Sequence, residues 1–160
     1  MKNVRVIAAF AAGLLTALGV GVALSAESET SQNNRFRAGF GVLNGAQEIG
    51  PDGQRNAGDR NGRGSFSGIF KRDTLCYGLN VTNIGKPVAA HIHKGSRGEN
   101  GDVVVTLKHP RRGNPGASKQ CLAVDSAIAD DIRSNPTQFY VNVHNAKFPG
   151  GAVRGQVFSR

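Results

Sequence analysis

The sequence predicts an all-β protein, an antiparallel β-sandwich with Greek-key-like connections and one short helix near residues 125–134. Short segments along the chain alternate apolar and polar residues with a period of two, the pattern of half-buried strands. Gly, Asn, Pro and Asp separate these segments, as turns between antiparallel strands require. No heptad repeat is present, and 22 glycines in 160 residues argue against a coiled coil.

Residues 1–26 are typical of a secretory signal peptide. Two basic residues among the first five precede an apolar stretch over 6–23, and small residues follow. Cleavage is therefore expected after Ala23 or Ala26. An uncleaved anchor is the alternative, because about 18–20 apolar residues can just span a bilayer. Both interpretations place the rest of the chain outside the cytoplasm, and cleavage would leave no stable membrane span.

The folded domain is expected over 36–160, after a polar and flexible leader at 27–35. Two polar, glycine-rich stretches, 50–64 and 108–119, are expected to be surface loops. The alternating segments that predict strands are 36–42, 65–70, 75–81, 88–93, 103–107, 139–144 and 153–157.

The segment 125–134 has helical spacing instead. Ile128 and Ile132 are four residues apart and would share one face of a helix. Asp125 or Ser126 can cap the start of this helix, and Asn135-Pro136 would end it.

Basic residues outnumber acidic ones by 20 to 11, which gives a net charge of +9. Nucleic acid is not an expected partner of an exported protein, and aromatic residues do not interleave with the basic ones as in a single-strand-binding surface. Anionic polymers of the cell envelope, lipid head groups or acidic polysaccharides are the expected counter-ions. Solubility alone is the alternative explanation of the charge.

Cys76 and Cys121 are the only cysteines, and they do not form a C-x-x-C pair. Export would bring them into an oxidising compartment, so we expect an intramolecular disulfide. Closing a loop of about 45 residues contributes roughly 4 kcal/mol in the chain-entropy model. Free thiols or an intermolecular bridge are the alternatives.

Histidines at alternate positions are the clearest chemical signal. On a strand, His91 and His93 would point to the same side, and Ile92 would face the core. If the strand that ends in His144 lies beside them, three nitrogens could converge into a copper or zinc site. The alternative is structural, with each imidazole hydrogen-bonded to backbone carbonyls. His109 lies in a loop and is a weaker candidate ligand.

Catalytic motifs are absent. No Gly-x-Ser-x-Gly segment is present, and no pair of acids lies in an apolar setting that would separate their pKa values. The glycine-rich stretch 95–101 leads into a strand rather than a helix, which excludes a dinucleotide-binding loop. We therefore predict no catalytic residue.

Several motifs follow one another in a fixed order over residues 36–158. They are L-N-G-A-Q-E at 43–48, L-C-Y-G-L-N-V at 75–81, A-H-I-H-K-G at 90–95, Y-V-N-V-H-N at 140–145 and F-P-G-G-A-V-R-G-Q at 148–156. Together they resemble the CHRD domain, the module named after chordin.

The resemblance implies an exported or extracellular all-β sandwich. In chordin the modules belong to an extracellular antagonist of growth-factor ligands, but this chain lacks the accompanying cysteine-rich modules, so that role is not carried over. The paired cysteines look like those of a bacterial subgroup. The motifs also imply a polar cluster that contains the three candidate histidines, with Asn142 and Arg154 as binding residues.

A fainter resemblance is to copper–zinc superoxide dismutase. It rests on the His-x-His pair, the later Val-His and a closing Arg-Gly segment. The copper site of that enzyme needs four histidines and its zinc site needs more, so the four histidines of this chain cannot build both. A copper-only site would have to recruit His109.

Two functions are therefore predicted. The first is a non-enzymatic, secreted module that binds an extracellular protein or an anionic envelope polymer. The second is a protein that binds Cu(II) or Zn(II) through His91, His93 and His144. Ligand nitrogens within about 4–5 Å of one another would favour the metal, since metal–nitrogen bonds are about 2.0–2.1 Å long. Imidazoles bonded to backbone carbonyls would favour a structural role.

Overall fold

A computed structural model describes residues 38–159 of the chain. The predicted signal peptide at 1–26, the leader at 27–35 and the predicted first residues of the domain lie outside this range. Within it, no helix is both long and apolar enough to cross a membrane.

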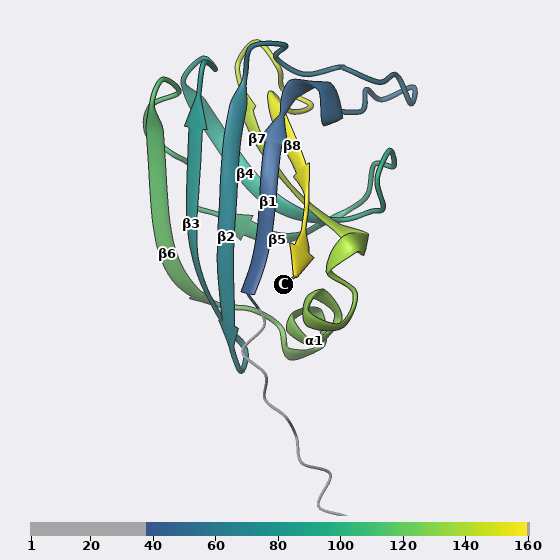
Figure 1. The fold of residues 1–160 in the computed structure, drawn as a ribbon, viewed down its shortest axis with the longest axis vertical. Coiled ribbons are helices and arrows are strands. Elements are labelled where there is room, and N and C mark those ends of the chain that lie inside the picture. The colour runs from purple at the N-terminus through teal and green to yellow at the C-terminus, as the bar shows by residue number, and fades with distance from the viewer. Residues whose placement is uncertain (1–37, 160) are drawn as a thin grey trace, which may run out of the picture. The chain divides into compact units, whose positions relative to one another are not determined.

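The strands of the described range belong to one antiparallel sheet, in the order β5-β4-β7-β8-β1-β2-β3-β6, and β9 pairs with β1. The sheet curls until its two halves face each other, so that the two layers of the predicted sandwich are parts of one nearly closed sheet (Figure 1). The all-β, antiparallel prediction is confirmed. The strands are β1 (Ala38–Asn44), β2 (Arg63–Lys71), β3 (Thr74–Thr82), β4 (Pro87–Lys94), β5 (Val103–Leu107), β6 (Gly116–Ala123), β7 (Phe139–Asn145), β8 (Val153–Gln156) and β9 (Phe158–Ser159).

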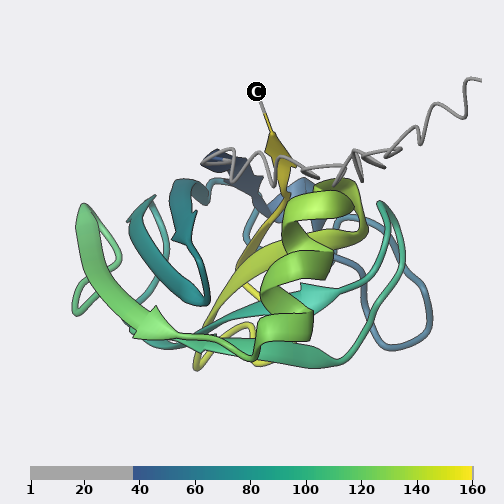
Figure 2. The same ribbon diagram turned by 90° about the horizontal axis from the view of Figure 1, so that it is seen from below.

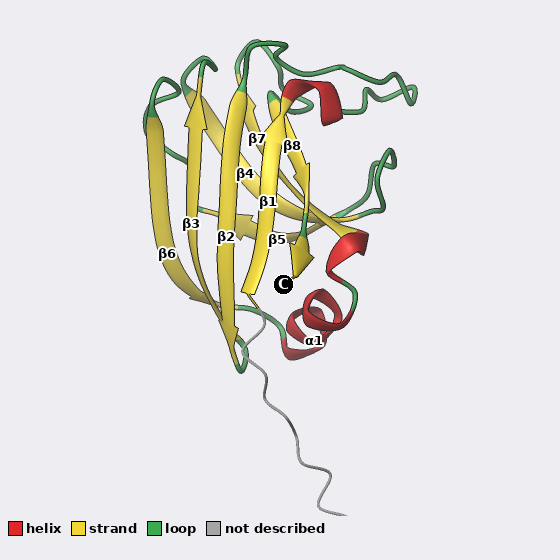
Figure 3. Ribbon diagram, in the orientation of Figure 1, coloured by secondary structure: helices red, strands yellow, loops and turns green. Residues whose placement is uncertain are grey.

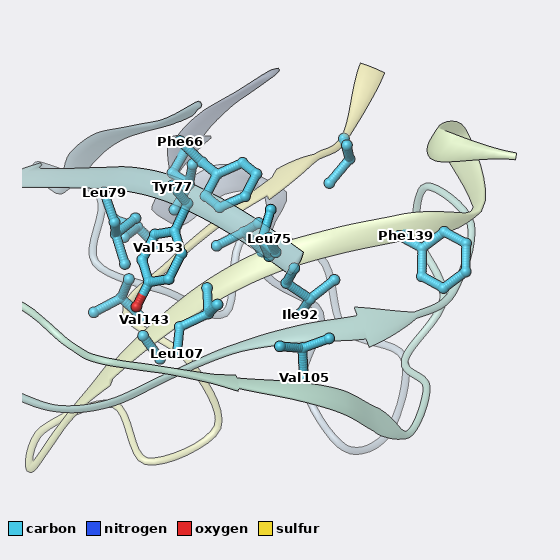
Figure 4. Close-up of a cluster of buried hydrophobic side chains, with 14 of the residues drawn as sticks. Phe66, Leu75, Tyr77, Leu79, Ile92, Val105, Leu107, Phe139, Val143 and Val153 are labelled. Atoms are coloured by element: carbon cyan, nitrogen blue, oxygen red, sulfur yellow. The ribbon is translucent and has the colours of Figure 1, made fainter. Parts of the chain in front are cut away.

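The core lies between the two halves of the sheet. Aromatic and aliphatic side chains of β2 and β3, such as Phe66 and Leu79, face those of β4, β5 and β7, such as Ile92 and Val143 (Figure 4). Leu79 and Val143 are fully buried. Burial of a side chain of this size stabilises a fold by about 1.5–3 kcal/mol.

The one α-helix of residues 38–159, α1 (Ser126–Ser134), lies where the sequence predicts it. The Asp125 carboxylate accepts hydrogen bonds from the N–H groups of Ala127 and Ile128, which caps the first turn. Ile132 is buried in the core. The short 3₁₀ helices η1 (Gly45–Gln47) and η2 (Pro136–Gln138) are the other helical turns of residues 38–159. Figures 2 and 3 show α1 across one end of the sheet.

The prediction of a loop over 108–119 is wrong for its last four residues, because β6 begins at Gly116. This strand lies at one edge of the sheet and is mostly exposed. Its middle residues Ser118, Lys119 and Gln120 are polar on both faces of the strand, since an edge strand has little apolar surface to bury. The alternation that reveals the inner strands is therefore missing here.

The phase of β1 also differs from the predicted one. Val42, which belongs to the apolar alternation, is 62% exposed, whereas Leu43 is fully buried. The apolar residues on the outer face are covered in part by β9, where the rings of Phe40 and Phe158 lie 6.0 Å apart. β1 therefore carries apolar residues on both of its faces, and the face that contains Leu43 is the one that packs in the core.

The predicted disulfide is confirmed. Cys76 and Cys121 are directly opposed in the β3–β6 pair and are joined by a disulfide. The bond ties the exposed edge strand to the strand that packs in the core. A structural disulfide indicates an oxidising compartment.

Candidate metal centre

The site lies on the face of β4 and β7 that points away from the core. These strands are antiparallel neighbours, and their register places His144 two residues along from the direct partner of His91. His91 and His93 share one face of β4, as their spacing predicts, and Ile92 is buried in the core on the other face. All three histidines therefore meet on one side of the sheet.

The three imidazoles are close enough for their nitrogens to share an ion. His91 Nδ1 lies 3.1 Å from His144 Nε2. One nitrogen of each of His91, His93 and His144 lies within 4.8 Å of the other two. The distance criterion for a metal site is therefore met.

Backbone carbonyls hold the other nitrogen of two of these rings. His93 Nδ1 lies 2.8 Å from the Gly101 carbonyl, and His144 Nδ1 lies 2.8 Å from the Pro149 carbonyl. A carbonyl only accepts, so in each pair the Nδ1–H donates. The neutral ring then carries a bare lone pair on Nε2. The histidines therefore meet both criteria at once: two of them bond to backbone carbonyls, and all three are close enough to share a metal ion.

The inward nitrogen of His93 has no partner. Its ring is 9% exposed, and its Nε2 is buried without a hydrogen bond in the described structure. His144 Nε2 faces His91 Nδ1 and, at 3.0 Å, the Asn142 side-chain amide. Asn142, a predicted binding residue, is 2% exposed and lies within the cluster.

Burial sets the protonation of the cluster. The pKa of His91 is lowered to about 4, chiefly by burial and then by the neighbouring His144 and His93. Burial, helped by the charges of His144 and Arg154, also lowers the pKa of His93, against the raising effects of the Gly101 carbonyl and the Asn142 side chain. Both rings are therefore neutral near pH 7, which is the form that binds a metal.

Tyr140 and Arg154 support His93. The His93 ring stacks on Tyr140 with ring centroids 4.8 Å apart, and the Arg154 guanidinium carbon lies 3.3 Å from the same tyrosine ring centroid. Arg154 is 1% exposed. It donates to Asn100 Oδ1 and to backbone carbonyls of the 95–101 loop, which carries the Gly101 carbonyl. Arg154, the other predicted binding residue, thus contacts the loop rather than the histidines.

Sequence reasoning missed two residues of this site. Tyr140 accepts a hydrogen bond from the Gly101 N–H at 3.3 Å and stacks on His93. Tyr140 stands two residues before Asn142 on the same strand, so the alternation of the strand could have placed it on the face of the histidines. Gly101 is required by space, because a Cβ there would overlap the Lys94 carbonyl oxygen. His109 does not join the cluster, and its Nδ1 bonds the Pro110 carbonyl instead.

One comparison with known proteins identifies the domain. The family described as the CHRD domain matches residues 40–157, which is nearly all of the described chain. Comparison with the curated proteins and with the solved structures finds no match.

Proposed function

The chain belongs to the CHRD domain family, and from that premise we propose that this member is an exported, non-enzymatic module that binds one Cu(II) or Zn(II) ion between His91, His93 and His144. The observation that carries the proposal is the buried His93 Nε2, which has no hydrogen-bond partner. A buried polar atom without a partner is costly, and a metal ion would satisfy it.

The spacing of the nitrogens supports one ion. Ligands about 2.0–2.1 Å from a tetrahedral ion lie about 3.4 Å from one another. The distance of 3.1 Å between His91 Nδ1 and His144 Nε2 is already close to this value. The three ligand nitrogens, one from each histidine, lie within 4.8 Å of one another, so a small inward shift of the side chains would bring them to a common ion. Three imidazoles leave a fourth position for water or for the Asn142 side chain.

The hydrogen bonds around the cluster also support it. Metal-binding histidines usually donate their second ring N–H to a carbonyl or carboxylate, which fixes the tautomer. The Gly101 and Pro149 carbonyls serve His93 and His144 in this way. His91 Nδ1–H donates to His144 Nε2 in the metal-free cluster, so an ion held by His91 Nδ1 would require the other neutral tautomer, with the proton on His91 Nε2. Cu(II) is expected to bind more tightly than Zn(II), following the Irving–Williams order.

Calorimetric titration of the exported, oxidised and tag-free protein with Cu(II) and Zn(II) tests the proposal. We expect one ion per chain with a dissociation constant below about 1 μM, and loss of binding in a His91→Ala/His93→Ala variant. His109→Ala is the matched control, because it removes a histidine outside the cluster and should bind normally. Equal binding by the double variant, or no binding by the wild-type protein, would contradict the site.

A larger partner is a separate part of the proposal. The excess of basic residues, which gives the full chain a net charge of +9, supports an anionic envelope polymer or an extracellular protein as the partner. The metal titration does not test this partner.

A further inference from the structure

A second site lies on the same outer face, beyond Arg154. We propose that a pocket of about 180 Å³ between Arg55, Arg97 and Arg154 binds a hydroxylated oxyanion, that is, a sugar or polyol that carries a phosphate or a carboxylate. Gln47 and Gln156 are the other polar residues of its wall, and none of its lining residues is acidic. The pocket contains none of the three histidines, although Arg154 at its base also contacts Tyr140, which stacks on His93. Binding of an anion here can therefore be tested on the metal-free protein.

Three distant parts of the chain bring the guanidinium groups together. Arg55 follows η1 and is held by a backbone bridge to Ile49. Arg97 belongs to the 95–101 loop, and Arg154 lies on β8. A Cβ added to Gly98 would lie 4.0 Å from Arg55 Nη2, which shows that the two loops meet at the pocket.

Arg154 places a positive charge without an ion pair at the base of this pocket. It is 1% exposed, and its hydrogen bonds go to neutral groups, namely the Asn100 side chain and the carbonyls of Ser96 and Glu99. The ion pairs of the described chain, Lys94–Asp131 and Arg133–Asp130, do not include it. A buried charge without a counter-ion is unfavourable, so an anion in the pocket would be stabilised.

The nearest buried acid does not cancel this charge at neutral pH. Glu48 is 2% exposed, and burial raises its pKa to about 8, although the positive charge of Arg154 acts in the opposite direction. Its carboxyl is thus largely protonated at pH 7. Its Oε1 atom has no hydrogen-bond partner.

The other two arginines are available to a ligand. Arg55 and Arg97 are exposed, and neither side chain makes a hydrogen bond or ion pair with a residue of the described chain. Guanidinium groups bind carboxylate and phosphate through paired, charge-assisted hydrogen bonds. Two free guanidiniums above a buried one therefore suit a single oxyanion.

The glutamines favour a ligand with hydroxyl groups over a bare anion. Gln47 Nε2 donates to the Val42 carbonyl, and Gln156 Nε2 donates to the carbonyls of Gly95, Thr137 and Phe139. The two N–H groups of Gln156 are shared among three carbonyls, so this side chain has only its carbonyl oxygen left, and Gln47 keeps its carbonyl oxygen and one N–H. A ligand hydroxyl can both donate to such oxygens and accept from that N–H, whereas a bare anion only accepts.

An adjoining hollow extends the site over apolar atoms. This second pocket, of about 330 Å³, shares Gln47, Arg97 and Gln156 with the first and adds Val157 and the 40% exposed Phe158. The carbon face of a sugar ring can pack on such a surface, while its acidic group reaches the arginines. A repeating acidic polysaccharide or a polyol phosphate has this combination of groups.

The first experiment is a ¹H–¹⁵N NMR titration of the exported, oxidised protein without metal, at constant ionic strength. The probes are glucose 1-phosphate, glucuronate, inorganic phosphate and neutral glucose. We expect saturable shifts at Gln47, Gly98 and Gln156 with at least one sugar acid, which binds several-fold more tightly than inorganic phosphate, and no shifts with glucose. The preferred sugar acid identifies phosphate or carboxylate as the recognised group. Shifts that are equally weak for every anion would overturn the proposal.

Matched variants distinguish a built pocket from general positive charge. We expect Arg55→Gln/Arg97→Gln to weaken binding of the preferred acid at least about tenfold, because two pairs of charge-assisted hydrogen bonds are lost. Arg60→Gln/Arg72→Gln changes the net charge equally at exposed positions outside the pocket, and we expect a change below about twofold. An equal loss in both variants would refute the site. Arg154 is kept, because it also anchors the 95–101 loop.

Discussion

Gly101 shows at the scale of one residue how the fold prepares the histidine cluster. Its carbonyl accepts from His93 Nδ1, and its N–H donates to the Tyr140 hydroxyl. A side chain at this position would overlap the Lys94 carbonyl oxygen. The glycine is therefore needed for close approach of the backbone, and the support of His93 depends on it.

We expect Gly101→Ala to lower the free energy of unfolding by about 1–3 kcal/mol, because the backbone around Lys94 must move. Metal affinity should fall by about 10–100-fold, since the carbonyl that orients His93 is displaced. Urea denaturation and calorimetry measure the two effects. Gly150→Ala is the control, because a Cβ there meets no atom within 4 Å. Unchanged affinity in Gly101→Ala would show that this carbonyl does not position the ligand.

Glu48 is a buried acid whose ionised form is unfavourable in the folded protein. Burial raises its pKa from an ordinary 4.5 to about 8. Between these values the folded protein holds a proton that the unfolded chain releases. Linkage then requires the free energy of unfolding to fall as pH rises from about 4.5 through 8.

We expect Glu48→Gln to flatten this dependence, because the amide keeps the shape of the carboxyl and does not titrate. The wild-type protein should lose up to about 1.4 kcal/mol of stability per pH unit through this group. Urea denaturation of both proteins from pH 5 to 9 measures the slope. Parallel curves for the two proteins would show that Glu48 titrates normally in the fold.

At the scale of the element, β6 is an edge strand with little support from the core. It forms one end of the sheet, and most of its side chains are exposed. Its pairing with β3 and the disulfide between Cys76 and Cys121 hold it in place. The stability of this edge should therefore depend on the covalent link.

We expect Cys76→Ala/Cys121→Ala to lower the free energy of unfolding by up to about 4 kcal/mol, since the unfolded chain regains the entropy of an open loop of about 45 residues. Chemical denaturation measures the change. A reductant should weaken the wild-type protein by a similar amount and leave the double variant unaffected. If the variant were as stable as the oxidised protein, β6 would be held by its backbone pairing alone.

At the scale of the whole molecule, metal binding should be linked to folding. The three histidines come from two strands that are distant in sequence, so the site exists only when β4 and β7 are paired. An ion that binds the folded protein alone raises its stability in proportion to the logarithm of the free ion concentration.

We expect free Cu(II) at 100 times its dissociation constant to raise the free energy of unfolding by about 2.7 kcal/mol. Thermal or urea denaturation with buffered Cu(II) measures the shift. The His91→Ala/His93→Ala variant should not respond, and His109→Ala should respond like the wild-type protein. An equal rise in all three proteins would place the ion elsewhere.

Much of the architecture was predictable because strand periodicity is local. The two-residue alternation located most of the strands, and the spacing of Ile128 and Ile132 located the helix. The presence of only two cysteines left one intramolecular pairing, which is the observed one. The prediction failed at β6, because an exposed edge strand lacks the alternation of apolar and polar residues. It also failed in the phase of β1, because that strand has apolar residues on both faces.

The sequence by itself determined the all-β class, the helix and the shared face of His91 and His93, because each depends on residues close along the chain. Only the tertiary structure placed His144 beside that pair, set Tyr140 and Arg154 behind it, and gathered Arg55, Arg97 and Arg154 around one pocket. These arrangements depend on the register between distant strands and on the close approach of two loops. Packing of the whole core decides the register, and the contacts between those loops decide their approach.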